Sequence, residues 1–144
     1  MKHLILAAAV ALTACQAQAE THLQLHGISK HVEQRAVGEW NERNVGLGLR
    51  KQYNPDFGVQ VGLYRNSISR TTAYALAQYT PLHVGKLSGG MFAGLASGYN
   101  YRYPVAGGLL ATYQGSVYST TVRYIPTIKG VATGVVALEV GVKF

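Results

Sequence analysis

The chain has 144 residues, of which 48% are hydrophobic and only 13% are charged. That length is typical of one domain, and the composition excludes a disordered chain, which combines low hydrophobicity with high net charge. The single Cys excludes an intramolecular disulfide framework, and the 17 Gly and 10 Tyr residues disfavour a helical bundle. The composition therefore predicts an all-β protein with little charge for its size.

The first residues are predicted to be an export leader that is not part of the fold. A short positive segment precedes an apolar run over Leu4–Leu12. That run is too short for a transmembrane helix, which needs about 20 apolar residues, and it fits a signal peptide. We expect a signal peptide over 1–19, cleaved after Ala19, and a barrel over 20–144; the alternative is lipoprotein cleavage before Cys15. Both routes indicate export from a bacterial cytoplasm by the general secretory route.

The mature chain is basic. Loss of Lys2 with the leader leaves 12 basic against 6 acidic residues, which is a net charge of +6. The sequence contains no basic run, no aromatic RNA-binding motif and no zinc-ligand spacing, so no nucleic acid partner is expected. Two interpretations of the charge remain open, namely contact with anionic lipid head groups and a scattered solvated surface.

Apolar residues alternate with small or polar residues along most of the mature chain, and a period of two predicts β-strands. The clearest strand is the last, in which every second residue from Val136 to Phe144 is apolar. In another strand Phe92 interrupts the polar side. Eight strands are expected, near residues 21–32, 44–50, 57–63, 71–80, 87–96, 105–114, 118–124 and 136–144.

Two kinds of β-structure are compatible with this alternation. A soluble barrel or sandwich turns its apolar face inward, whereas a transmembrane barrel turns it toward lipid and fills its lumen with small polar residues. The polar faces consist mainly of Gly, Ala, Ser, Thr, Gln and Asn, and the apolar set carries a charge only at a strand end, at Lys51. We therefore expect an eight-stranded antiparallel up-and-down transmembrane β-barrel, an all-β fold, in the bacterial outer membrane.

Two features of the strand ends agree with a membrane location. Tyrosines cluster near predicted strand ends, where an aromatic girdle would lie: Tyr53, Tyr79, Tyr99, Tyr101 and Tyr103. A final strand that ends in Phe144 is the usual form in outer-membrane barrels, and it predicts recognition by the barrel-assembly machinery. Outer-membrane lipids, both phospholipid and lipopolysaccharide, are the expected surroundings.

Turn residues orient the predicted barrel, because the periplasmic side carries both termini and the short turns. Asn54-Pro55-Asp56, Gln114-Gly115-Ser116 and the connection over 81–85 are expected to be periplasmic. The external loops are then residues 33–42, 65–71, 99–104 and 126–133. A barrel of eight strands has no open channel, so passive conduction is not expected.

Reactive side chains gather at the predicted outer ends of the first and third strands. His26 lies on the lumen-facing side of the first strand, and Asn66 and Ser67 follow the third. A Ser with a nearby His is the minimum for acyl transfer, because the imidazole takes the hydroxyl proton. Ser29 and His31, two residues apart and therefore on one face, form an alternative pair.

Structural interpretations stand beside these chemical ones. A His in a lumen is commonly a hydrogen-bonded filler, and Ser67 beside Asn66 is commonly a turn residue whose side chain bonds the local backbone. No cofactor motif is present. No metal is expected, because Cys or carboxylate at ligand spacing is lacking around the histidines of the mature chain, which are His22, His26, His31 and His83.

The order of several short motifs resembles the outer-membrane lipid A palmitoyltransferases, over residues 41–144. The motifs are Asn41-Glu42-Arg43, Gly46-Leu47-Gly48-Leu49, Gly62-Leu63-Tyr64-Arg65-Asn66-Ser67, Tyr79-Thr80-Pro81-Leu82, Pro104, Gly107-Gly108-Leu109-Leu110, Tyr124-Ile125-Pro126 and the closing strand to Phe144. The resemblance implies an eight-stranded barrel that moves a palmitoyl chain from a phospholipid to lipid A.

The resemblance also implies roles for particular residues. Ser67 matches the Ser of the family, and His26 lies near the position of its His. Asn66 stands where the family has Asp, and an amide cannot act as a base, although it can orient a neighbour. The amphipathic helix that precedes the family's barrel has no counterpart here. The chain is therefore a divergent relative.

Three functions follow from the sequence. The first is a lipid A acyltransferase that uses His26 and Ser67. The second is a non-enzymatic barrel that stabilises the membrane or presents its loops to a phage, a host or another protein. The third is a lipid A deacylase that uses Ser29 and His31, although the usual order in that family is His before Ser.

Overall fold

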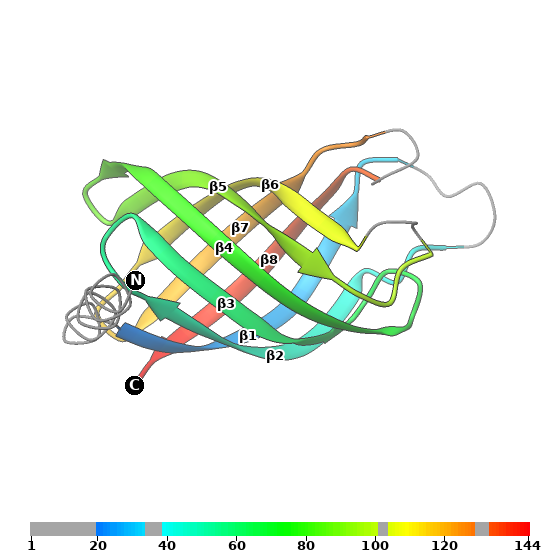
Figure 1. Cartoon of the computed structure of the whole chain (residues 1–144), viewed down its shortest axis with the longest axis horizontal. Helices are drawn as coiled ribbons and strands as arrows, with labels where there is room; N and C mark the ends of the chain where they lie inside the picture. The colour runs from blue at the N-terminus through cyan, green and yellow to red at the C-terminus, as the bar shows by residue number, and fades with distance from the viewer. Residues whose placement is uncertain (1–19, 34–38, 101–103, 129–132) are drawn as a thin grey trace, which may run out of the picture.

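The computed structural model describes residues 20–33, 39–100, 104–128 and 133–144, and it shows a closed antiparallel barrel (Figure 1). Within these residues the chain forms eight strands, each hydrogen-bonded to the next, and the last pairs with the first. The strands are β1 (Glu20–His31), β2 (Arg43–Gln52), β3 (Phe57–Arg65), β4 (Thr71–Val84), β5 (Leu87–Ala96), β6 (Val105–Gln114), β7 (Tyr118–Ile125) and β8 (Val135–Lys143).

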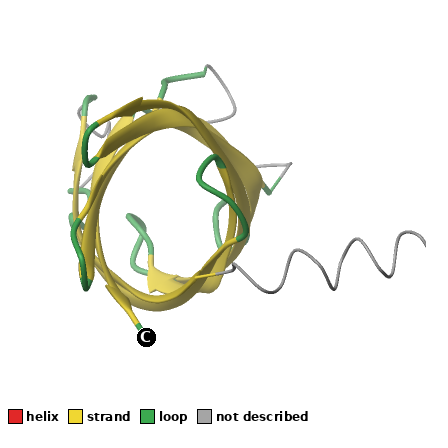
Figure 2. Ribbon diagram, turned by 90° about the vertical axis from the view of Figure 1, so that its left-hand side faces the viewer, coloured by secondary structure: helices red, strands yellow, loops and turns green. Residues whose placement is uncertain are grey.

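Figure 2 shows the strands as an unbroken ring. Closure leaves no sheet edge with unpaired backbone groups, which is the condition for a β-structure in lipid. The predicted fold is confirmed, and the alternation places the side chains as expected. In the described residues no helix is long and apolar enough to cross a membrane. The predicted leader, with its two alternative cleavage positions, lies outside the described residues.

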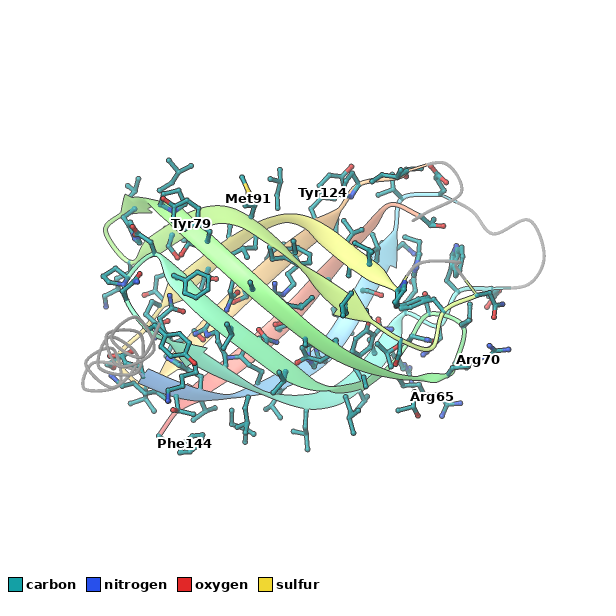
Figure 3. The ribbon with its side chains drawn as sticks, in the orientation of Figure 1. Arg65, Arg70, Tyr79, Met91, Tyr124 and Phe144 are labelled. Atoms are coloured by element: carbon teal, nitrogen blue, oxygen red, sulfur yellow. The ribbon has the colours of Figure 1, made fainter. Side chains whose placement is uncertain are left out.

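The outer surface of the barrel is apolar and the interior is polar (Figure 3). Val45, Leu47 and Leu63 are more than half exposed, and the same face of the other strands carries Leu, Val, Met and Tyr. The buried interior holds mostly amides, hydroxyls and charged groups. This inside-out distribution is the one that a lipid environment requires, because apolar side chains then meet acyl chains and polar ones meet one another.

The two ends of the barrel differ. One end, called here the turn end, carries the start of β1, the C-terminal residue Phe144 and the connections β2–β3, β4–β5 and β6–β7 (Figure 1). The other end, called here the loop end, carries the connections β1–β2, β3–β4, β5–β6 and β7–β8. The turn end corresponds to the side predicted to be periplasmic.

One predicted turn was placed incorrectly. Strand β4 does not stop at residue 80 but continues through Pro81 to Val84, and the turn is formed by Gly85, whose φ is +59°, and Lys86. Pro81 is tolerated in the strand because the β4–β5 register shifts between Tyr79 and Leu82. A proline, which has no backbone N–H to donate, fits at such an irregularity.

A second register shift changes which side chains of β1 face inward. It lies between His26 and Ile28, at Gly27. Before the shift the even-numbered residues face the lumen, and after it Ser29 and His31 do so while Ile28 is exposed. The shift therefore brings Ser29 and His31 to the same side of the wall as His26.

The aromatic residues only partly follow the prediction. Tyr79 is exposed on the outer surface, as a girdle residue would be (Figure 3). Tyr99 instead approaches Tyr64, with the two hydroxyl oxygens 3.0 Å apart. Tyr101 and Tyr103 lie outside the described residues. Phe92, which interrupts the polar side of β5, does point inward and is 3% exposed.

Gly90 faces the β4 irregularity at very close range. A methyl carbon at Gly90 would lie 2.7 Å from Thr80 Cα and closer still to the Tyr79 carbonyl oxygen. The neighbouring Gly89 has room, since its nearest atoms would be 3.9 Å from such a carbon. A side chain is therefore excluded at Gly90, whereas the adjacent Gly89 has room for one.

We predict that Gly90→Ala destabilises the barrel by about 1–3 kcal/mol, the usual cost of an overpacked site. Gly89→Ala, which adds the same methyl group one residue away, is the matched control and is expected to leave stability unchanged. Urea unfolding in lipid vesicles measures both. Equal unfolding midpoints for the two variants would contradict the proposed close approach.

Candidate functional site

The middle of the lumen is crossed by a hydrogen-bonded cluster around Glu139, which lies on β8 and is 4% exposed. Arg123 Nε donates to Glu139 Oε1 at 2.8 Å, and Gln60 Nε2 donates to Oε2 at 3.1 Å. His26 Nδ1 lies 3.3 Å from Oε1. These groups come from β1, β3, β7 and β8, so the cluster ties distant parts of the wall together.

Arg123 is held on several sides. Its Nη2 donates to Gln60 Oε1 at 2.7 Å and to Gln78 Oε1 at 3.2 Å. The guanidinium carbon lies 4.7 Å from the centre of the Phe92 ring, a cation–π distance. The inward Phe92 thus has a partner, and the side chains of this cluster fill the centre of the barrel.

His26 belongs to the same cluster. Its Nε2 is 2.6 Å from the hydroxyl of Tyr74, which in turn accepts a hydrogen bond from Gln60 Nε2 at 3.0 Å. The rings of Tyr64 and Tyr74 lie 5.3 and 5.1 Å from the imidazole. A carboxylate on one nitrogen and a hydroxyl on the other is the pattern of an oriented general base, but here the hydroxyl belongs to Tyr74.

Asn66 organises the β3–β4 connection. Its Oδ1 accepts hydrogen bonds from the backbone N–H groups of Ile68 and Arg70, at 3.1 and 2.9 Å. Its Nδ2 donates to Thr72 Oγ1 and to the Gly98 carbonyl, both at 3.0 Å. The side chain is 0% exposed, and both ends of the amide are engaged in the turn.

Ser67 lies at the loop end beside a small cavity of about 90 Å³, which His26 also lines. Ser67 is 8% exposed, and its carbonyl oxygen accepts a hydrogen bond from the Asn41 N–H at 2.9 Å. The structure thus brings Ser67 and His26 to one cavity. It does not join them by a hydrogen bond, because the His26 nitrogens face Tyr74 and Glu139.

The alternative pair also lines this cavity, but each member has another partner. The Ser29 hydroxyl donates to Asn44 Oδ1, and Asn44 Nδ2 donates to the Arg65 carbonyl at 2.9 Å. The His31 ring stacks on Trp40, with centres 4.4 Å apart and planes 10° apart. Ser29 and His31 therefore share a side of the wall without bonding to each other in the described structure.

An exposed ion pair lies just outside this cavity. Lys30 Nζ is 3.0 Å from Glu42 Oε2, and this contact lowers the pKa of the Glu42 carboxyl below its usual value. Glu42 Oε1 also accepts a long hydrogen bond of 3.4 Å from the His31 backbone N–H. These contacts fasten the end of β1 to the segment that enters β2.

Sequence reasoning missed the centre of the cluster. Its members Glu139, Arg123, Gln60 and Tyr74 are not among the candidate site residues that the sequence predicts. A signal was available, because Glu139 stands on the polar side in the middle of an alternating strand, where it needs a cation inside the barrel. In the described parts of the chain, no three His, Cys, Asp or Glu side chains come together as a metal site.

The fold is similar to that of a known outer membrane protein, although the sequence matches no known family. No family model matches the chain, and no curated protein matches it. Among solved structures, the chain is similar to the outer membrane protein Ail of Yersinia pestis, determined in a phospholipid bilayer nanodisc, with 14% sequence identity and a TM-score of 0.47. The alignment covers 88% of this chain and 100% of that one.

We predict that Glu139→Gln lowers the free energy of unfolding by about 3–5 kcal/mol, because it leaves the Arg123 guanidinium buried without its carboxylate. Urea unfolding in vesicles measures the loss. Glu42→Gln, which breaks the exposed pair with Lys30, is the control and is expected to have no measurable effect.

The double variant Arg123→Met/Glu139→Gln removes both charges and is expected to recover much of the lost stability. A Glu139→Gln barrel as stable as the unmodified one would show that the ion pair does not hold the lumen together.

Proposed function

We propose that this protein is a non-enzymatic barrel of the bacterial outer membrane that associates with anionic lipid through its loop end. In this proposal the turn end faces the periplasm and the loop end faces outward. The leader is removed after Ala19, and the final strand with Phe144 is recognised by the barrel-assembly machinery. The observation that carries the proposal is a pair of outward-facing arginines without acidic partners, above the apolar band.

The two arginines are Arg43, at the start of β2, and Arg65, at the end of β3. Tyr64 pairs with Gly46, so both arginines lie on neighbouring strands at the loop end. Both are exposed, and no salt bridge found in the described residues includes either one. Figure 3 shows Arg65 and Arg70 pointing away from the barrel at this end.

Apolar side chains lie directly along the same strands, namely Val45 and Leu47 on β2 and Val61 and Leu63 on β3. A guanidinium at the border of such a band lies at the depth of lipid phosphates, and it binds phosphate oxygens in a bidentate manner. The phosphates of lipid A in the outer leaflet are therefore the partner that this surface fits.

The lumen supports a non-enzymatic role. The nitrogens of His26 face Tyr74 and Glu139, and both ends of the Asn66 amide already form hydrogen bonds in the β3–β4 connection. The cavity that Ser67 and His26 share holds about 90 Å³, which is little room for a long acyl chain. The polar side chains of the interior thus serve to hold the barrel closed.

We predict that Arg43→Gln/Arg65→Gln weakens binding of lipid A in detergent micelles about thirtyfold, because each cation near an anionic surface contributes about 1 kcal/mol. The only tryptophan of the chain, Trp40, lies at the loop end and reports binding by its fluorescence. Lys51→Gln removes a charge at the turn end and is the control, which is expected to bind lipid A as the unmodified barrel does. If the double variant binds lipid A as tightly as Lys51→Gln does, the loop-end arginines are not the binding surface.

A second candidate is a lipid A acyltransferase, and it is favoured by one observation: Ser67 and His26 line the same cavity at the loop end. In that mechanism His26 would take the Ser67 hydroxyl proton while Glu139 orients the imidazole. The Tyr74 hydroxyl would first have to leave His26 Nε2. A deacylase that uses Ser29 and His31 would likewise require both side chains to exchange their present partners.

Mass spectrometry of lipid A from cells that produce the protein separates these functions. For the non-enzymatic barrel we expect unchanged lipid A with the unmodified protein, with Ser67→Ala and with His26→Ala. An added acyl chain that disappears in both variants would establish the acyltransferase instead. A missing acyl chain that returns in Ser29→Ala and His31→Ala would establish the deacylase.

A further inference from the structure

A second cavity, larger than the one at the loop end, lies away from that end. It opens at the turn end, holds about 460 Å³ and is lined by residues of the short turns and of the inner wall. His22, Arg50 and Gln78 form its deep part, and Thr80 and Lys86 lie nearer the opening. The cavity meets the cluster around Glu139 only at Gln78, whose Oε1 accepts from Arg123, and the surface proposed for lipid at the loop end lies away from it.

Arg50 is the unusual group in this cavity, because none of the salt bridges found among the described residues includes its buried guanidinium. Its side chain is 4% exposed on β2, and its Nη2 donates to the neutral groups Ser119 Oγ at 3.1 Å and Gln114 Oε1 at 3.4 Å. Its Nε is buried without a hydrogen-bond partner in the described structure. A buried charge is ordinarily paired, since desolvation is otherwise unfavourable.

The acidic residues of the chain do not provide that counter-ion. Glu139 binds Arg123, Glu42 binds Lys30, and Asp56 lies 2.8 Å from His83. Glu20 lines the cavity, but Lys143 Nζ lies 2.5 Å from its Oε1, and His22 Nε2 lies 3.6 Å from its Oε2. The remaining acids, Glu33 and Glu39, belong to the β1–β2 connection at the opposite end.

Further donors face the same space. Gln78 is 4% exposed; its Oε1 accepts from Arg123, and its Nε2 is a buried donor without a partner among the described residues. His22 also lines this space, but its Nε2 is directed at the Glu20 carboxylate, 3.6 Å away, so the proton of the neutral ring lies on Nε2 and Nδ1 is an acceptor. The cavity therefore presents a guanidinium, an amide N–H and, near its opening, the Lys86 ammonium.

We propose that this turn-end cavity binds a phosphate-bearing anion, with Arg50 as the central ligand. A phosphate group has three strong acceptor oxygens, which suit several converging donors better than the two oxygens of a carboxylate. In the orientation proposed above, the cavity opens to the periplasm. Free phosphate and the phosphate of a lipid head group share this chemistry, and the test below separates the two sources.

The test is calorimetric titration of the full-length mature barrel, in micelles of a sugar detergent that carries no phosphate. Inorganic phosphate is the first probe, and sn-glycerol 1-phosphate, the phosphate end of a lipid head group, is the second. We expect saturable binding that is at least about tenfold weaker in Arg50→Gln, because one charged hydrogen-bonding group is lost. Tighter binding of the first probe indicates free phosphate as the source, and tighter binding of the second indicates a head group.

Lys51→Gln is the matched control, because it removes a cation from the next residue, whose ammonium lies over the Tyr53 ring 5.5 Å from its centre. It is expected to bind both probes as the unmodified barrel does. Arg50→Lys keeps the charge and is expected to bind more tightly than Arg50→Gln.

A measurement on the unmodified barrel tests the proposal without relying on a variant that could misfold. The Arg50 Nε–H resonance is expected to shift as phosphate is added, and the shift should saturate with the calorimetric binding curve. An unmoved Arg50 resonance, or equal binding by the Arg50→Gln and unmodified barrels, would overturn the proposal. So would the absence of saturable binding of either probe, because ordinary hydration would then suffice for the cavity.

Discussion

Pairing of β8 with β1 is the constraint on which the rest of this structure depends. It removes the last free edge of the sheet, so every strand can lie in lipid with its backbone groups satisfied. Closure with so few strands also makes the lumen narrow, and a narrow lumen must be filled by side chains. The polar interior is thus a consequence of closure, and a charge inside can be stabilised by a partner on another strand, as Arg123 is by Glu139.

Closure also explains where the regular pattern fails. A narrow barrel bends its strands strongly, and the bends are taken up at irregularities such as Gly27 in β1 and Pro81 in β4. The irregularity at Gly27 determines which side chains line the loop-end cavity, because the odd-numbered residues of β1 face inward after it and the even-numbered residues face inward before it. The irregularity at Pro81 needs Gly90 opposite it, since a larger residue would meet the backbone of β4.

The strands could be predicted from the sequence because alternation is a local property, and the last strand shows it without a break to Phe144. The end of β4 could not, because Pro81 suggests a turn unless the partner strand is known. The candidate site was harder still. His26 was correctly placed inside, but its partners Glu139 and Tyr74 come from strands that only the closed ring brings near. The sequence predicts local backbone bonding for Ser67, whereas the structure shows it for the neighbouring Asn66, whose Oδ1 accepts from the N–H groups of Ile68 and Arg70.

The start of β1 and the end of β8 lie together at the turn end, and this has a consequence for how such a protein can change. A chain built of successive hairpins, with its first and last strands side by side, can gain or lose one hairpin without moving either terminus across the membrane. The obstacle to growth is inside the barrel. An added hairpin would widen the ring and carry Arg123 away from Gln60 and Gln78 on the facing wall. The contacts between the side chains that fill this lumen therefore favour a barrel of eight strands over a wider one.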